Sequence, residues 1–295
     1  MKRTSTSDDL LSPPDSAKGQ LQREAFKALK RHEEAHELPT SIRFLFYELE
    51  QAGILSKNKT GARRADQYLA EAVKHLRDVG LVPWDWIVDE TRRLHYFDGS
   101  ATIARDLLEF LSAAHIDPWH GKIRPFILTE SRTLSGVFAR TIAPQYRVPV
   151  ASTNGQCGGF LVTDIAPRLR VEKFQVAYFG DFDLAGSSIE ANTRSVLKRH
   201  TGITFDEESW ERIAITEVQA NNLRSQGVEP IQKTDRRFAD GHVHEAFEAE
   251  ALGQGMISRI LRDWLDERLP EPLARVHVRE RRQRAKVRRL LETLK

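Results

Sequence analysis

Three acidic side chains follow two predicted β-strands of this 295-residue chain. The apolar run at residues 126–129 ends in Glu130, and the run at residues 174–179 leads into Gly180, Asp181 and Asp183. Because sites in parallel sheets form at the carboxyl ends of the strands, we expect these carboxylates to meet at one edge. Clustered carboxylates repel one another unless a cation neutralises them, and hard oxygen ligands suit Mg²⁺ in contact with phosphate. The pattern predicts a Mg²⁺ site at Glu130, Asp181 and Asp183; alternatively, Asp and Gly simply belong to a strand-to-helix turn.

A second candidate pair, Arg43 and Tyr47, lies in a predicted helix over residues 42–52. The apolar positions of this helix recur at i, i+3, i+4 and i+7, and they are Ile42, Leu45, Phe46 and Leu49. Arg43 and Tyr47 are one turn apart and lie off this apolar face. We therefore expect the two side chains to project outward together.

Two other groups of polar residues carry weaker signals. The acidic stretch at 247–252 contains Glu250, a candidate additional acid of the site, although a glutamate before a helix commonly just compensates the helix dipole. His242 and His244 flank Val243 and have the side chains of zinc ligands, but two histidines at strand spacing are more often surface residues.

The N-terminal elements follow the order of a winged-helix module. Helices are predicted at residues 17–36, 42–52 and 62–79, and residues 82–97 mix β-forming and charged residues as a short hairpin does. In a winged-helix module the second helix enters the major groove of DNA. The turn before that helix supplies the predicted DNA contacts Lys57, Lys59, Arg63 and Arg64. A helical subdomain with a solvated basic loop is the alternative interpretation.

The central region alternates strands with helices. Strands are predicted at residues 126–129, 146–151, 174–179 and 212–216, with a loop at 156–159, and this alternation indicates a parallel sheet. The predicted fold class is therefore α/β, a winged-helix module followed by a Rossmann-like parallel-sheet domain. We expect a flexible leader and helix at residues 1–37, the winged helix at 38–115, the sheet domain at 120–272 and a basic helix at 273–295.

Composition excludes several classes of protein. With 40% hydrophobic and 29% charged residues, the chain can bury a sizeable core. The single cysteine, Cys157, forms no internal disulfide and fits a reducing, cytoplasmic compartment. No run of about 18 apolar residues predicts a membrane span. The first 16 residues lack the apolar segment of a secretory signal and are expected to be a flexible lead-in.

Positive charge is concentrated in the last segment. Residues 273–295 contain nine Lys or Arg and two Glu, a local charge of +7, so that the other residues sum to about −4 against a total of +3. Apolar residues at helical spacing, Val287, Leu290, Leu291 and Leu294, predict a docked amphipathic helix. Its arginines, among them Arg281 and Arg282, are predicted to contact phosphate without reading base sequence.

Together these motifs resemble a known combination of domains. Glu130 followed by Asp181-x-Asp183-x-x-Gly186 resembles the Toprim fold of topoisomerases and related nucleases. The stretch from Arg43 to Tyr47 resembles the Arg-x-x-aromatic-Tyr motif of the winged helix in the topoisomerase VI A subunit and its meiotic double-strand-break relatives. Residues 247–252 are similar to the E-A-L stretch after Toprim in that family, and the likeness spans residues 38–268. Here DFDLAG lacks the proline of the family's motif, and Ser131-Arg132 replaces its usual lysine.

The resemblance implies Mg²⁺-dependent cleavage of DNA phosphodiester bonds. Tyr47 is then the candidate nucleophile, Arg43 pairs with phosphate or stabilises phenolate, and Glu130 is an acid, base or metal-linked carboxylate beside the Mg²⁺ ligands Asp181 and Asp183. Some related nucleases use metal-bound water instead of the tyrosine. The family also implies a homodimer and, because this chain has no Gly-rich ATPase motif, a separate ATPase subunit for any strand passage. The alternative function is that of a non-catalytic DNA-binding or complex-assembly protein with a vestigial Toprim site.

Overall fold

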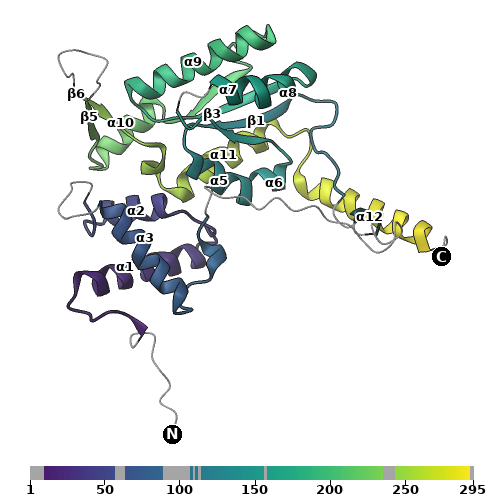
Figure 1. The fold of residues 1–295 in the computed structure, drawn as a ribbon. Coiled ribbons are helices and arrows are strands. Elements are labelled where there is room, and N and C mark those ends of the chain that lie inside the picture. Colours follow the sequence, from purple (N-terminus) through teal and green to yellow (C-terminus); the bar gives the residue numbers. More distant parts are fainter. Residues whose placement is uncertain are drawn as a thin grey trace.

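A module of three helices packs against a layered α/β part (Figure 1). The structure is a computed structural model that describes residues 10–56, 64–88, 107–108, 110–111, 114–155, 158–234 and 243–292. One apolar core continues from the helical module into one side of the sheet, so the two parts share buried side chains. Residues 1–9 of the predicted 16-residue lead-in lie outside the described residues.

The helical module consists of α1 (Ala17–Glu34), α2 (Ile42–Gln51) and α3 (Ala65–Asp78). Ser41 caps α2, since its hydroxyl accepts a hydrogen bond from the Phe44 N–H at 3.2 Å. The predicted hairpin begins instead as a short 3₁₀ helix, η2 (Trp84–Trp86), and Ile87 then forms an isolated bridge with Thr40. The rest of that hairpin, from residue 89, lies outside the described residues.

The α/β part is built on a four-stranded sheet in which every neighbouring pair is parallel, which confirms the predicted parallel sheet. Its strands are β1 (Arg124–Thr129), β2 (Val150–Ser152), β3 (Phe174–Phe179) and β4 (Trp210–Ala214), in the order β2-β1-β3-β4. The second predicted strand started too early, because Pro144 favours the short helix α6 (Ala143–Tyr146). The fourth ended too late, because Thr216 forms a capping box that begins α10 (Glu217–Ser225).

Helices cover both faces of the sheet (Figure 1). One face packs on α5 (Arg132–Thr141) and α11 (Gln254–Arg268), and the other on α8 (Ala166–Val171) and α9 (Leu184–Thr201). Successive strand residues alternate between these two cores: Ile127 joins the first, whereas Phe126 and Leu128 join the second. The predicted loop at 156–159 is wrong at its end, because Gly158 begins α7 (Gly158–Phe160), which continues into a π-helical turn, η3 (Leu161–Ile165).

A separate antiparallel pair, which the sequence did not suggest, lies beside the sheet. It consists of β5 (Ile231–Thr234) and β6 (Val243–Ala246), with Lys233 paired opposite His244. Beyond β6, Phe247 forms an antiparallel bridge with Phe182, so the end of this pair is hydrogen bonded to the loop that contains Asp181 and Asp183. The short 3₁₀ helix η4 (Ala249–Leu252) then leads to α11.

The predicted basic helix is present as α12 (Leu273–Glu292). Two residues of the face expected to dock, Val287 and Leu290, are exposed, and the side chains of Leu291 and Leu294 lie outside the described part of the chain. Contact is made at its start, where Val276 is buried and Glu280 accepts hydrogen bonds from His115 and from the Ile116 N–H, both at 3.0 Å. Val287 is 40% exposed and Leu290 65% exposed, because α12 extends away from the body after its first turns (Figure 1). Among the described residues, no helix combines the length and the apolar character needed to cross a bilayer.

Phe138 offers a test of the core on which the site rests. It is fully buried on α5, and its ring packs edge-on against Phe179 of β3 with centroids 5.1 Å apart. Phe138→Ala should lower the free energy of unfolding by about 3–5 kcal/mol, since it leaves a cavity beneath the sheet. The same substitution at Phe160, which is 38% exposed on α7, is the matched control in denaturant unfolding. Equal costs at the two positions would contradict this packing.

Candidate functional site

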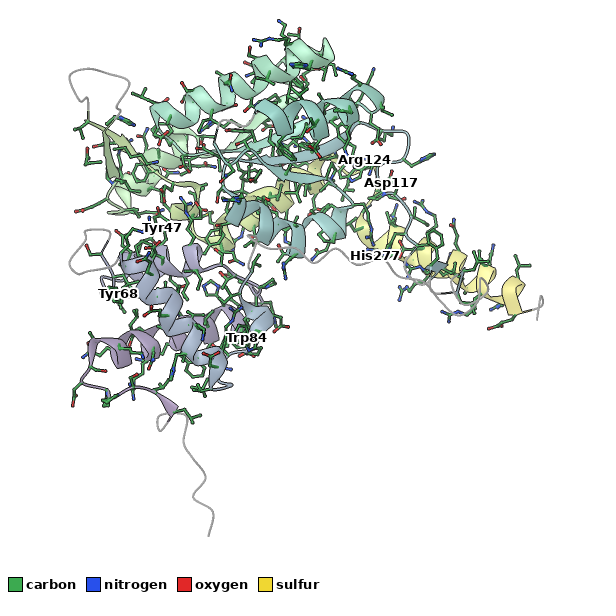
Figure 2. The ribbon with its side chains drawn as sticks, viewed as in Figure 1. Tyr47, Tyr68, Trp84, Asp117, Arg124 and His277 are labelled. Atoms are coloured by element: carbon green, nitrogen blue, oxygen red, sulfur yellow. The ribbon has the colours of Figure 1, made fainter. Side chains whose placement is uncertain are left out.

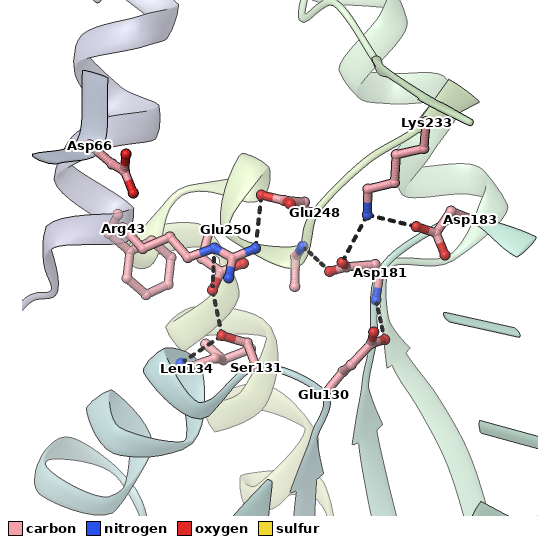
Figure 3. A network of polar contacts seen from close by, with 12 residues as sticks. Arg43, Asp66, Glu130, Ser131, Leu134, Asp181, Asp183, Lys233, Glu248 and Glu250 are labelled. Carbon is pink, nitrogen blue, oxygen red and sulfur yellow. Dashed lines mark hydrogen bonds and ion pairs between the residues drawn. The ribbon is translucent and has the colours of Figure 1, made fainter. Parts of the chain in front are cut away.

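Glu130 and Asp181 meet because their strands are neighbours. Thr129 of β1 pairs with Phe179 of β3 in parallel register, so both strands end at the same level. The Asp181 N–H donates a hydrogen bond to Glu130 Oε2 at 3.3 Å. The structure thus brings together these two sequence-predicted residues at the carboxyl edge of the sheet, as Figure 3 shows.

Asp183 both belongs to the acidic cluster and caps a helix. It is the N-cap of α9, and its Oδ1 accepts a hydrogen bond from the Gly186 N–H. A Cβ on Gly186 would lie 2.4 Å from the Asp181 carbonyl oxygen, so only glycine fits at that position of the DFDLAG stretch. The acid-x-acid-x-x-Gly spacing therefore produces a tight turn that presents Asp181 and Asp183 next to each other.

Lys233 supplies a positive charge that sequence reasoning missed. Its Nζ donates to Asp183 Oδ2 at 2.8 Å and lies 3.5 Å from Asp181 Oδ2 (Figure 3). The only local signal was the β-forming Ile231 and Thr234 around it, in a strand of four residues. Its position opposite two acids some 50 residues earlier depends on the β5–β6 pair, which only the tertiary structure reveals.

The carboxylates of the site differ in how readily they ionise. Burial raises the pKa of Glu130 to about 7, and the negative charge of Asp181 contributes to the same rise. Burial also acts against ionisation of Asp183, but the hydrogen bonds from Lys233 and Gly186 outweigh it and lower the pKa of Asp183. Lys233 shows the reciprocal effect: burial disfavours its charge, yet its contacts with Asp183 and Asp181 raise its pKa. At neutral pH the site therefore contains a Lys–Asp ion pair beside a glutamate near its titration point.

A second network joins α2 to the acidic stretch. Arg43 Nη2 lies 2.8 Å from Glu248 Oε2, and Arg43 Nε lies 3.3 Å from Glu250 Oε1. The Ser131 hydroxyl donates to the same Glu250 oxygen at 2.7 Å. Glu250 is completely buried, and this burial raises the pKa of its carboxyl group although Arg43 opposes the rise. The Ala249 N–H between the two glutamates donates to Asp181 Oδ1 at 3.1 Å, which connects the networks.

Tyr47 does not project into solvent as expected. Its side chain is only 4% exposed and packs edge-on against Phe46, with ring centroids 5.8 Å apart. The helical spacing correctly identified one apolar face of α2, but the other side is also covered: Gln51 donates a hydrogen bond to the Ala251 carbonyl, and Arg43 pairs with Glu248. Tyr47 thus lies where the helical module meets the α/β part (Figure 2).

A cleft of about 1110 Å³ lies between the helical module and the carboxyl edge of the sheet. Its α/β wall includes Glu130, Asp181 and Arg132, and its helical wall contains further cations together with part of Tyr47. The cations of the helical wall are Arg43, Arg64, Lys74 and Arg77. Cationic and acidic side chains therefore face the same space.

The predicted DNA contacts have separate locations. Arg64 lines the cleft and pairs with Asp66, while Lys57, Lys59 and Arg63 lie outside the described residues. Arg281 and Arg282 are exposed on α12, which extends away from the body (Figure 1). Of the two histidines considered for zinc, His242 is not described, and neither ring nitrogen of His244 has a hydrogen-bond partner.

Within the described residues no group of three or more His, Cys, Asp or Glu side chains is arranged to hold a metal ion as it stands. Lys233 already contacts two of the predicted ligands.

Comparison of the chain with protein-family models, with curated proteins and with solved structures gave no significant match.

Glu130→Gln tests the electrostatics of the site in metal-free buffer with EDTA. The folded pKa near 7 exceeds the ordinary value of 4.5, so the folded chain binds this proton more tightly than the unfolded chain. That stabilisation is complete below about pH 4.5 and is lost as the pH rises through about 7. Glutamine stays neutral, so the variant's Tm relative to the parent should rise by about 2–5 °C between pH 5 and pH 8. A pH-independent difference, like that expected for the exposed Glu207→Gln, would contradict this assignment.

Proposed function

We propose that this chain cleaves DNA phosphodiester bonds with the help of Mg²⁺. The observation that carries the proposal is the convergence of Glu130, Asp181 and Asp183 at one edge of the sheet. Glu130 and Asp181 also line a large cleft whose walls carry arginines and a lysine. Carboxylates favour a hard cation, and the cations along the cleft favour a polyanion such as the DNA backbone. The resemblance to Toprim proteins and to the topoisomerase VI A subunit supports the same reaction.

The three carboxylates suit magnesium in the chemistry of their donor atoms. The Asp181 and Asp183 Oδ2 atoms already share one positively charged neighbour, the Lys233 ammonium group. Glu130, Asp181 and Asp183 would hold the ion, which would polarise the phosphate and stabilise the leaving oxygen. Glu130, with its pKa near 7, is suited to accept or donate a proton at neutral pH.

The identity of the nucleophile is a separate part of the proposal. Tyr47 faces the cleft with part of its side chain but is 4% exposed, and this burial favours water as the attacking group. Arg43 is engaged by Glu248 and Glu250, so we assign it a positioning role that connects α2 to the acidic stretch. On this proposal α1 to α3 act as the winged-helix DNA-binding module and the parallel sheet as the Toprim-like domain.

A second candidate function is favoured by the Lys233 contacts. Because one ammonium group neutralises part of the acidic cluster, the carboxylates have a structural use without any metal. A non-catalytic DNA-binding or complex-assembly protein would have this property. As a homodimer, on either proposal, the chain would present two clefts, and a separate ATPase subunit would be needed only for strand passage.

Plasmid cleavage distinguishes the two functions. The purified chain should convert supercoiled DNA to nicked or linear forms with Mg²⁺ and not with EDTA. Asp181→Asn should reduce the rate at least about a hundredfold, because it removes a charged ligand from the site. Asp263→Asn, on the exposed side of α11, is the matched control and should cleave at the parental rate. Retention of parental activity by Asp181→Asn, or no Mg²⁺-dependent cleavage by the parent, would overturn the proposed enzyme.

Tyr47→Phe separates the two nucleophiles. If water attacks, the variant should cleave within about threefold of the parental rate, since the ring still fills its buried position. Denaturing gels run with and without protease treatment should then show no protein-linked DNA ends for the parent or the variant. Protein-linked 5′ ends that disappear in Tyr47→Phe would instead identify the tyrosine as the nucleophile.

A further inference from the structure

We infer that the Lys233 ammonium group occupies the cation position between Asp181 and Asp183 in the metal-free chain and leaves it when Mg²⁺ binds. Lys233 thereby sets the metal concentration at which the site fills. The inference deepens the proposed function and rests on it, because Asp181 and Asp183 are the proposed metal ligands.

The four oxygens of the two aspartates are divided between two kinds of partner. The Oδ1 atoms accept hydrogen bonds from backbone N–H groups, that of Asp181 from Ala249 and that of Asp183 from Gly186. The Oδ2 atoms both face Lys233, at 3.5 Å from Asp181 and 2.8 Å from Asp183. Backbone contacts therefore orient both carboxylates, while the Lys233 ammonium group contacts the Oδ2 atom of each.

Lys233 also covers the aspartate that lies deepest. The side chain of Asp183 is 1% exposed and that of Asp181 12% exposed, whereas Lys233 is 33% exposed. A metal ion that reached the Asp183 Oδ2 atom would meet the Lys233 ammonium group first. The two cations thus compete for the same oxygens instead of binding side by side, since like charges at contact distance repel strongly.

The position of Lys233 in the fold allows it to leave. It belongs to the two-stranded β5–β6 pair and not to the four-stranded sheet that holds the carboxylates. A lysine side chain has four rotatable methylene groups, and the exposed third of Lys233 gives it a route to solvent. His244, directly opposite on β6, has no hydrogen-bond partner at either ring nitrogen among the described residues, so Lys233 is the side chain that contacts the two aspartates in this state.

The charges of the site indicate whether Mg²⁺ or the Lys233 ammonium group is bound more favourably. The ammonium group carries one positive charge and contacts two carboxylates, whereas Glu130 contacts the Asp181 backbone and not Lys233. Three carboxylates in one half-buried cluster are neutralised more completely by a divalent ion than by a single ammonium group. At sufficient concentration Mg²⁺ should therefore displace the Lys233 ammonium group. By occupying the site beforehand, Lys233 should weaken the apparent affinity of the chain for Mg²⁺.

The test is a calorimetric titration of the metal-stripped full chain with MgCl₂. Lys233→Gln should bind Mg²⁺ about tenfold or more tightly than the parent, which corresponds to about 1.4 kcal/mol. Lys198→Gln, an exposed lysine of α9, is the matched control and should bind like the parent. As a second readout, Mg²⁺ should raise the Tm of Lys233→Gln more than that of the parent, because the variant without metal leaves its aspartates uncompensated.

Lys233→Arg keeps a cation in place and guards against a glutamine variant that folds poorly. It should gain no Mg²⁺ affinity over the parent, and adding Asp181→Asn to Lys233→Gln should abolish the gain. Equal or weaker binding by Lys233→Gln, with clear binding by the parent, would overturn the inference and leave the proposed metal site intact. Absence of Mg²⁺ binding in the parent and in both Lys233 variants would overturn the metal site and the inference together.

Discussion

The parallel register of β1 and β3 forces Glu130 and Asp181 side by side, and the tight turn after Asp181 adds Asp183 to the same small volume. Three carboxylates at a half-buried edge repel one another, and each loses part of its hydration. Neighbouring groups partly compensate this concentration of negative charge. Backbone N–H groups donate hydrogen bonds to Asp181 and Asp183, and Lys233 pairs with both of these aspartates. The pKa of Glu130 rises to about 7.

The two networks come from parts of the chain that are far apart in sequence. Arg43, on α2, holds Glu248 and the buried Glu250, while Lys233, on β5, holds Asp181 and Asp183. Ala249, between the two glutamates, donates to Asp181, so the networks share a backbone segment. This shared segment fixes the helical module and its cations relative to the acidic edge of the cleft.

Local sequence signals were reliable where a single element decided the outcome. Ser41 and the apolar spacing after it correctly predicted α2, and the runs that end at Thr129 and Phe179 correctly predicted two central strands. Errors arose where a second element intervened. Tyr47 lies off the apolar face of α2 yet is buried, because residues about 200 positions later cover that side. Val287 and Leu290 of the predicted apolar stripe on α12 are exposed for the opposite reason, since the described contacts of that helix with residues 114–116 lie before them, at Glu280 and Arg284.

The amino-acid sequence by itself determined the three N-terminal helices, the parallel central strands and the placement of acids at the ends of two strands, because caps, periodicity and turn residues act over a few neighbours. The folded turn added the reason for glycine at position 186, where a Cβ would lie 2.4 Å from the Asp181 carbonyl oxygen. Only the tertiary structure decided which cation meets those acids and how Tyr47 is buried. Charge pairing and burial depend on partners brought together by strand order and helix packing, and no window of local sequence contains both members of such a pair.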